Sequence, residues 1–220
     1  MGAMVVEDNY EYELIKLDTE RGEVLCRYYF PYLQHPASMA VVYVTGVGGD
    51  WGTPAVGLYP RLCISLARMG IDGLRVRYRH PTDLSESVFD TLAGIAFLKE
   101  KRRKKAIGLV GHSFGGAVII QAAVAAPDIV STIVTLATQS YGAAEGISKL
   151  KTRTSSLLIH GTHDKVLPVY CSQQVYQQAA EPKKIILYKG ASHGLEEVSE
   201  EVYELVYGWL ANNLLLPDTF

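Results

Sequence analysis

The stretch GLVGHSFGGAV, residues 108–118, is the part of the sequence that decides the fold. An apolar run ends in it, Ser113 lies among glycines, and a second apolar run begins directly afterwards. One interpretation is a strand-to-helix turn that a serine caps. The other is that the turn exists to present the hydroxyl of Ser113. The remaining sequence has to distinguish the two.

Short apolar runs alternate with longer segments of helical spacing along most of the chain. The runs are rich in branched residues, as buried parallel strands are; they are residues 39–45, 73–78, 106–111, 130–137, 155–161 and 184–189. The helical segments are residues 55–69, 84–101, 114–126, 168–180 and 197–215. Strands that alternate with helices imply right-handed crossovers and a parallel sheet covered on both faces.

Two further stretches near the N-terminus predict an antiparallel hairpin. Residues 10–17 (YEYELIKL) and 23–30 (EVLCRYYF) are rich in β-formers, and DTERG separates them. We assign no structure to the opening residues MGAM, part of which resembles the remnant of an expression tag. The prediction is an α/β protein, a three-layer α/β/α sandwich whose mostly parallel sheet has about eight strands with the hairpin at its N-terminal side. No linker or repeat divides the chain, so residues 1–220 are expected to form one domain.

Composition and charge argue against several classes of function. With 48% hydrophobic and 20% charged residues, the 220-residue chain is typical of a globular protein. A net charge of −2 gives no positive field for a polyanion, which argues against nucleic acid as a partner. No apolar run approaches the roughly eighteen residues of a membrane span. We therefore expect a small-molecule substrate and no attachment to a membrane.

Cysteine usage and one basic run complete the general expectations. Cys26, Cys63 and Cys171 are widely spaced and include no C-x-x-C, which predicts neither a disulfide framework nor a zinc site. We expect a reducing, cytoplasmic compartment and no metal or other cofactor. The basic run KEKRRKK, residues 99–105, follows a predicted helix. Cations complement a helix C-terminus, so we expect a solvated helix end.

In a parallel α/β sheet, ligands bind beyond the carboxyl ends of the strands, so the residues after each predicted strand are candidates for chemistry. The sequence from Gly111 to Gly115 fits G-x-S-x-G between a strand and a helix, which is the context of a nucleophile elbow. Crowding explains the two glycines, because so sharp a turn leaves no space for a Cβ on either side of the serine. A serine hydroxyl is a poor nucleophile by itself, so a base and an acid must follow.

His193 is the candidate base and Asp164 is the candidate acid. His193 follows the last predicted strand in GASHG, where an imidazole can reach over Ser113. Asp164 lies just past the preceding predicted strand in HGTHDKVLP and would hold the imidazole in the correct tautomer. The loop TQSYG, residues 138–142, offers no rival carboxylate.

Other histidines receive structural interpretations. His112 precedes the serine and is expected to point elsewhere, whereas His160 closes a strand and is expected to be packed. A metal site formed by His160, His163 and Asp164 is an alternative, but H-x-x-H-D lacks a recognisable helical ligand spacing.

With these motifs together, the chain resembles α/β-hydrolase fold proteins, specifically the small, capless, esterase-like members grouped with dienelactone hydrolase relatives. The resemblance covers nearly the whole chain and depends on TGVGG, GHSFGG, HGTHDKVLP and GASHG in the order of the family. Two positions depart from it. Thr45-Gly46 stands where the family often has His-Gly, and dienelactone hydrolases proper use a cysteine where this chain has Ser113.

The resemblance implies an oxyanion hole and a pocket. Two backbone N–H groups would hold the oxyanion: that of Phe114, after the nucleophile, and that of Val47, in the glycine-rich loop. Residues 138–154, where larger relatives carry a lid, number only 17. We therefore expect an open, shallow pocket with Trp51, Phe114 and Tyr141 as apolar walls.

Together these features predict a single α/β-hydrolase domain without a cap. It would cleave small carboxylic esters or thioesters through Ser113, His193 and Asp164, with an acyl-enzyme intermediate. A peptidase or amidase with the same triad stays open as an alternative, and so does a non-catalytic binding protein on the same fold. The complete triad argues against the last of these, because the fold alone does not require it.

Overall fold

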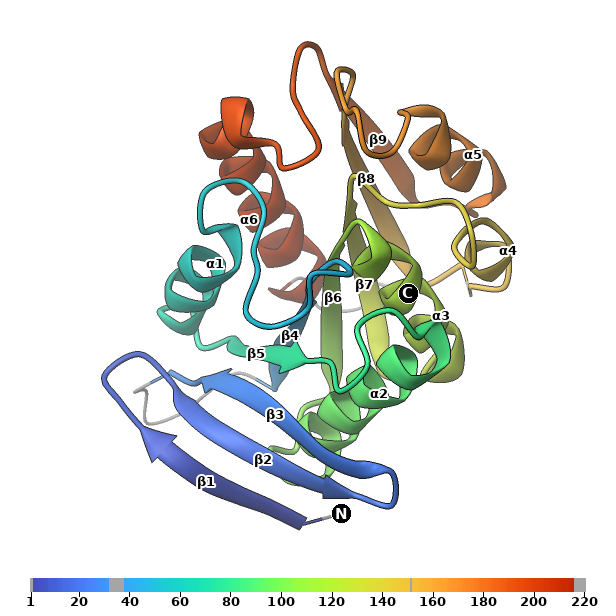
Figure 1. The fold of residues 1–220 in the computed structure, drawn as a ribbon. Coiled ribbons are helices and arrows are strands. Elements are labelled where there is room, and N and C mark those ends of the chain that lie inside the picture. Colours follow the sequence, from blue (N-terminus) through green and yellow to red (C-terminus); the bar gives the residue numbers. More distant parts are fainter. Residues whose placement is uncertain (1, 32–37, 151, 216–220) are drawn as a thin grey trace.

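A mixed β-sheet runs through the whole molecule (Figure 1). The structure is a computed structural model that describes residues 2–31, 38–150 and 152–215. Within these ranges the sheet has nine strands in the order β1-β2-β3-β5-β4-β6-β7-β8-β9. The strands are β1 Gly2–Asp8, β2 Glu13–Thr19, β3 Gly22–Tyr29, β4 Met39–Val44, β5 Asp72–Arg77, β6 Ala106–His112, β7 Val130–Leu136, β8 Ser155–Gly161 and β9 Lys183–Tyr188.

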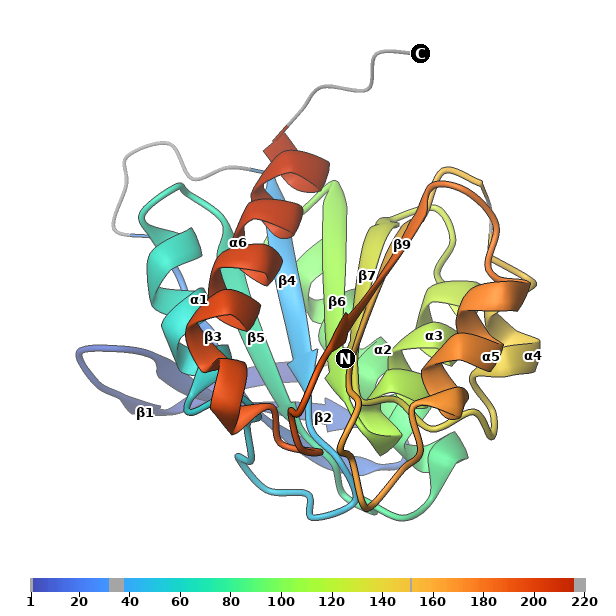
Figure 2. The same cartoon turned by 90° about the horizontal axis from the view of Figure 1, so that it is seen from above.

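Helices cover both faces of the sheet, which Figure 2 shows from above. One face carries α1 (Leu58–Ala67) and α6 (Ser199–Leu215), and the other carries α2 (Leu84–Glu100), α3 (Phe114–Ala125) and α5 (Tyr170–Gln178). Along the chain, the short α4 (Ala144–Ile147) lies between β7 and β8, and the 3-10 turn η1 (Glu196–Val198) lies between β9 and α6. None of the helices in the described ranges has the length and hydropathy of a transmembrane span.

Alternation along the strands divides the interior into two cores. In β4, for example, Ala40, Val42 and Val44 pack against the side of α2 and α3, whereas Val41 and Tyr43 pack against the side of α1 and α6. Because both faces are covered, the strand is apolar throughout, as the sequence pattern indicated. The carboxyl ends of β4, β6, β7 and β8, which pair in parallel, meet at one edge.

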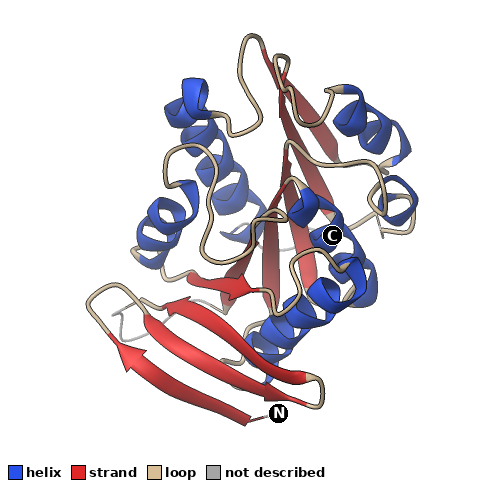
Figure 3. Cartoon of the chain, viewed as in Figure 1, coloured by secondary structure: helices blue, strands red, loops and turns tan. Residues whose placement is uncertain are grey.

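The structure confirms the predicted α/β class and the N-terminal hairpin, here formed by β2 and β3. It adds a strand, because Gly2–Asp8, which includes most of the opening MGAM, forms β1 and pairs with β2 (Figure 3). The sheet therefore has nine strands rather than about eight. All residues of β1 are exposed, so no face of it is buried and no alternation of apolar and polar residues is required.

The basic run 99–105 is not wholly solvated, which corrects the expectation for it. Lys104 is 5% exposed, and its Nζ lies 2.7 Å from Oδ1 of Asp72, the first residue of β5. The hydroxyl of Tyr28 also donates to Asp72. Burial raises the pKa of Asp72, although both partners oppose that shift. The cluster of basic residues in the sequence did not indicate that Lys104 pairs with a buried carboxylate on β5.

The connection between β7 and β8 contains little structure of its own. In the described part of residues 138–154, α4 is a helix of four residues that contacts α3 and α5. The described residues of this connection form no helix or strand other than α4.

Candidate active site

Ser113 occupies a sharp turn between β6 and α3. Its backbone has φ 57° and ψ −119°, a conformation that residues other than glycine rarely adopt. The N–H of Ser113 donates to Leu136 O at 2.8 Å, and Ser113 O accepts from Gly116 N at 3.0 Å. These bonds fix the strained turn from both sides and place the serine at the carboxyl edge of the sheet.

The two glycines of the pentapeptide lie in close backbone contacts. A Cβ on Gly111 would lie 2.2 Å from Gly115 O, and a Cβ on Gly115 would lie 2.5 Å from Thr45 O. Real Cβ atoms do not approach backbone oxygen so closely. The predicted crowding around the serine is confirmed, and it forces both positions to be glycine.

The glycine-rich loop after β4 runs beside the serine. A Cβ on Gly46 would lie 3.3 Å from Ser113 Cβ and 3.7 Å from Ser113 Oγ. Gly49 N–H donates to Gly46 O at 3.0 Å, which closes a turn around Val47. On the other side, Phe114 is the first residue of α3, where backbone N–H groups have no partner within the helix. The two segments expected to hold an oxyanion therefore flank Ser113.

Asp164 lies in the loop after β8 with its side chain fully buried. Oδ1 accepts from the N–H groups of Val166 and Leu167, both at 2.8 Å, and Oδ2 lies 2.7 Å from His193 Nδ1. Burial by itself would raise the pKa of Asp164. The bonds from His193 and from the two backbone groups outweigh burial and hold that pKa below its ordinary value. Asp164 is therefore an ionised acceptor that fixes the Nδ1–H tautomer of His193.

His112 lies against His193, which corrects the expectation that it points elsewhere. Its Nε2 is 3.0 Å from His193 O, and the ring centroids are 4.8 Å apart. Burial lowers the pKa of His112 to about 4, so the ring is neutral at pH 7 and donates Nε2–H to that carbonyl. The residue before the serine thus holds the loop that carries the candidate base, a contact between segments that sequence spacing did not indicate.

His160 is fully buried, as expected, but it also contacts Asp164. Its Nδ1 lies 2.7 Å from Ser172 Oγ, and its Nε2 lies 3.0 Å from Asp164 Oδ2 and 3.1 Å from Leu167 O. Burial lowers the pKa of His160 and favours the neutral ring. The i, i+4 spacing of His160 and Asp164 in HGTHD was the one sign of this contact in the sequence. Within the described ranges, no three His, Cys, Asp or Glu side chains are arranged to hold a metal ion.

A cleft of about 680 Å³ opens beside the serine turn. It is lined by Val47, Thr82, Asp83, Leu84, Ser85, Phe114, Gln139 and Tyr141. Of the expected pocket walls, Phe114 and Tyr141 are therefore brought together with Val47. Trp51 lies elsewhere, with the Arg27 guanidinium 4.3 Å from its ring centroid. The residues after β5, which the sequence analysis did not assign to the pocket, form much of its wall.

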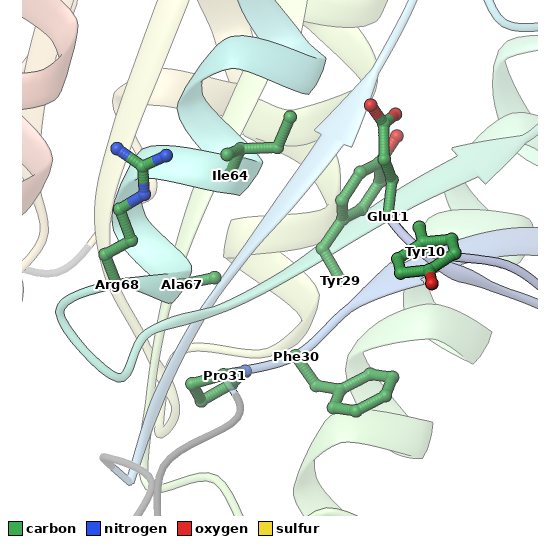
Figure 4. A pocket seen from close by; sticks show the side chains of 8 residues that line it. All are labelled: Tyr10, Glu11, Tyr29, Phe30, Pro31, Ile64, Ala67 and Arg68. Carbon is green, nitrogen blue, oxygen red and sulfur yellow. The ribbon is translucent and has the colours of Figure 1, made fainter.

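Another pocket, of about 460 Å³, lies away from this edge (Figure 4). Ile64 and Ala67 of α1 form one side of it, and Tyr10, Phe30 and Pro31 lie on the other. Tyr29, which also lines it, pairs with Gly73 near the beginning of β5. Because β5 is parallel to β4, this pocket belongs to the opposite end of the strands from Ser113.

A sequence profile of the dienelactone hydrolase family matches residues 75–210, which is more than half of the chain. No curated protein sequence matches the chain significantly. Est1E from Butyrivibrio proteoclasticus has a similar structure, with a TM-score of 0.79, 16% identity, and coverage of 92% of this chain and 99% of that one.

Two further solved structures share the fold. XC6422 from Xanthomonas campestris, described as an α/β serine hydrolase without a lid, gives a TM-score of 0.78 at 17% identity and covers 96% of this chain and 98% of its own. Dienelactone hydrolase from Anabaena variabilis gives a TM-score of 0.79 at 15% identity, and the match covers 93% of this chain and 98% of that one.

The neutral, buried His112 predicts how stability depends on pH. In the unfolded chain a histidine binds its proton near pH 6.5, whereas folded His112 does so only near 4. Between these values the unfolded state binds more protons, so the free energy of unfolding falls as the pH is lowered, by up to about 3 kcal/mol from this group. His112→Gln keeps a donor but cannot titrate, and we expect urea unfolding to show a shallower loss between pH 6.5 and 4.5.

His163→Gln, which changes an exposed histidine, is the control and should keep the wild-type slope. His160 still titrates in the His112 variant, so the slope is reduced and not abolished. Equal slopes in His112→Gln and wild type would contradict the assignment.

Proposed function

Because the chain belongs to the dienelactone hydrolase family and is a hydrolase of the α/β fold, we propose that it cleaves small carboxylic esters or thioesters with Ser113 as nucleophile, His193 as base and Asp164 as acid. The observation that best supports this proposal is the 2.7 Å contact between His193 Nδ1 and the buried Asp164 carboxylate, at the edge where the strained turn holds Ser113. The same fold without catalysis would not require this arrangement.

The mechanism follows from the tautomer that Asp164 imposes. Since Nδ1–H of His193 donates to Asp164, Nε2 is free to accept the proton of the Ser113 hydroxyl. Ser113 Oγ bonds to the carbonyl carbon, and the resulting oxyanion accepts from the N–H groups of Val47 and Phe114. The intermediate collapses as His193 gives its proton to the leaving alcohol or thiol. Water then repeats the sequence on the acyl-enzyme and releases the acid.

Two features suit Asp164 to this role. Its pKa is held below the ordinary value, so it stays negatively charged at neutral pH and stabilises the imidazolium that forms on His193. Its four donors, two backbone N–H groups and two imidazoles, also fix its orientation. A carboxylate held in this way needs to move little when positive charge develops on the imidazole of His193.

Ser113→Ala tests the nucleophile directly. A fluorophosphonate reacts with an activated serine, so we expect it to label the wild type and to leave the variant unlabelled, with ester hydrolysis lost in parallel. Mass spectrometry of the labelled peptide should place the adduct on Ser113. Equal labelling of both proteins, or an adduct on Ser140 or Ser192, would overturn the assignment.

Asp164→Asn tests the acid. An amide at this position favours the wrong tautomer of His193, so we expect kcat to fall by roughly 10³- to 10⁴-fold. Far-ultraviolet circular dichroism should show that the fold is retained. Asp18→Asn, at an exposed residue of β2 that does not line the cleft, is the comparison and should keep most of the activity. A variant of Asp164 with near-normal turnover would show that another group orients the base.

The open cleft predicts a preference for short acyl groups. A buried methylene contributes about 0.8 kcal/mol, and an uncovered cleft loses this contribution for each carbon left in water. We expect kcat/KM on p-nitrophenyl esters to be highest from acetate to butyrate and to fall beyond about six carbons, without activation at a lipid interface. Highest activity on laurate, or a rise in rate above the micellar concentration, would disprove this preference.

A further inference from the structure

A second hollow, of about 470 Å³, lies next to the cleft beside Ser113. It is lined by Leu84, Ser140, Tyr141, Gly142, Ala144, Glu145, Gln174 and Gln178. Leu84 and Tyr141 line both spaces, so the two are adjacent. A substrate that reacts at Ser113 can therefore extend past Tyr141 toward α4 and α5.

Tyr141 stands between the two spaces on a fixed loop. The residue is 80% exposed, although its backbone is anchored: Gln139 Nε2 donates to Tyr141 O at 2.9 Å, and Gln121 donates to Gly142 O. Gly142 has φ +74°, and a Cβ there would lie 2.6 Å from Leu84 Cδ2. The loop is thus held in one conformation while it presents an aromatic ring to solvent, which is a suitable platform for a ligand.

Polar side chains from α4 and α5 line one side of the hollow. Gln174 and Gln178 lie one turn apart on α5, and Glu145 belongs to α4. Within the described part of the chain, no hydrogen bond or ion pair occupies these three side chains. No lysine or arginine is among the lining residues, so the hollow offers nothing to balance an anion.

We propose that this hollow binds the hydroxyl-rich alcohol, a sugar or similar polyol, of the ester that Ser113 cleaves. Two amides and a carboxylate can donate to and accept from hydroxyl groups, and a tyrosine ring packs against the apolar face of a sugar ring. The proposal rests on the proposed function: because the acyl group is short, the alcohol is the part that extends past Tyr141. Hydrolysis breaks the acyl C–O bond, and the sugar oxygen receives its proton from His193.

A matched pair of acetates tests the proposal. Methyl 6-O-acetyl-glucopyranoside and cyclohexylmethyl acetate carry the same ester on rings of similar size, and they differ in the ring oxygen and the hydroxyl and methoxy groups. We expect kcat/KM for the sugar acetate to be at least about tenfold higher, as one or two good hydrogen bonds allow. The double variant Gln174→Leu/Gln178→Leu should bring this ratio near one, through a higher KM for the sugar acetate.

The ratio is measured within one protein sample, so it does not depend on how much of a variant is folded. Gln177→Leu, an exposed glutamine on the same helix that does not line the hollow, is the control and should keep the wild-type ratio. A wild-type ratio near one, or a ratio that the double variant leaves unchanged, would overturn the subsite. A preference for acetylcholine over both esters would also overturn it, since Glu145 and Tyr141 would then recognise a cation.

The result is separable from a failure of the proposed function. If p-nitrophenyl acetate is hydrolysed no faster by the wild type than by Ser113→Ala, the esterase activity itself is disproved. If that hydrolysis depends on Ser113 but the two acetates react equally, only the sugar subsite is disproved.

Discussion

The first turn of α3 lies directly against the end of β4, and the rest of the candidate site depends on this contact. A Cβ on Gly115 would lie 2.5 Å from Thr45 O and 2.9 Å from Val44 O, so only glycine permits the approach. The approach brings the loop that begins at Gly46 beside the serine turn. The serine turn and the glycine-rich loop, which follow different strands, are thus positioned by one backbone contact. This rigidity suits the proposed mechanism, because electrostatic stabilisation of a transition state requires donors that are already oriented.

A second constraint operates at Asp164, whose buried carboxylate joins two histidines from different parts of the chain. His160 comes from β8 and His193 from the loop after β9, and both approach Oδ2. A buried charge is stable only when it is fully hydrogen-bonded, and the two backbone N–H groups on Oδ1 complete the set. The loops after two neighbouring strands are therefore held together by the same carboxylate that orients the imidazole of His193.

The sequence predicted what depends on local pattern and missed what depends on contacts between distant segments. Buried parallel strands are apolar throughout and bounded by turns, so their positions were readable, as was the serine turn with its two glycines. The exposed β1 has no buried face and gave no such pattern. The contact of His112 with His193, and the buried partner of Lys104, join residues far apart in the chain. The sequence pattern did not predict the second hollow, because much of its polar wall lies on α4 and α5 rather than after a strand.

The backbone of Ser113 has a consequence for how this protein can evolve. A residue other than glycine held at φ 57° costs on the order of 1–3 kcal/mol, which the surrounding structure must supply. Replacement by glycine would relieve that strain, so selection for thermal stability alone would favour loss of the hydroxyl. Under the proposed function, stability and activity are therefore antagonistic at this one position, and a lineage that retains the serine does so against the thermodynamic preference of its own fold.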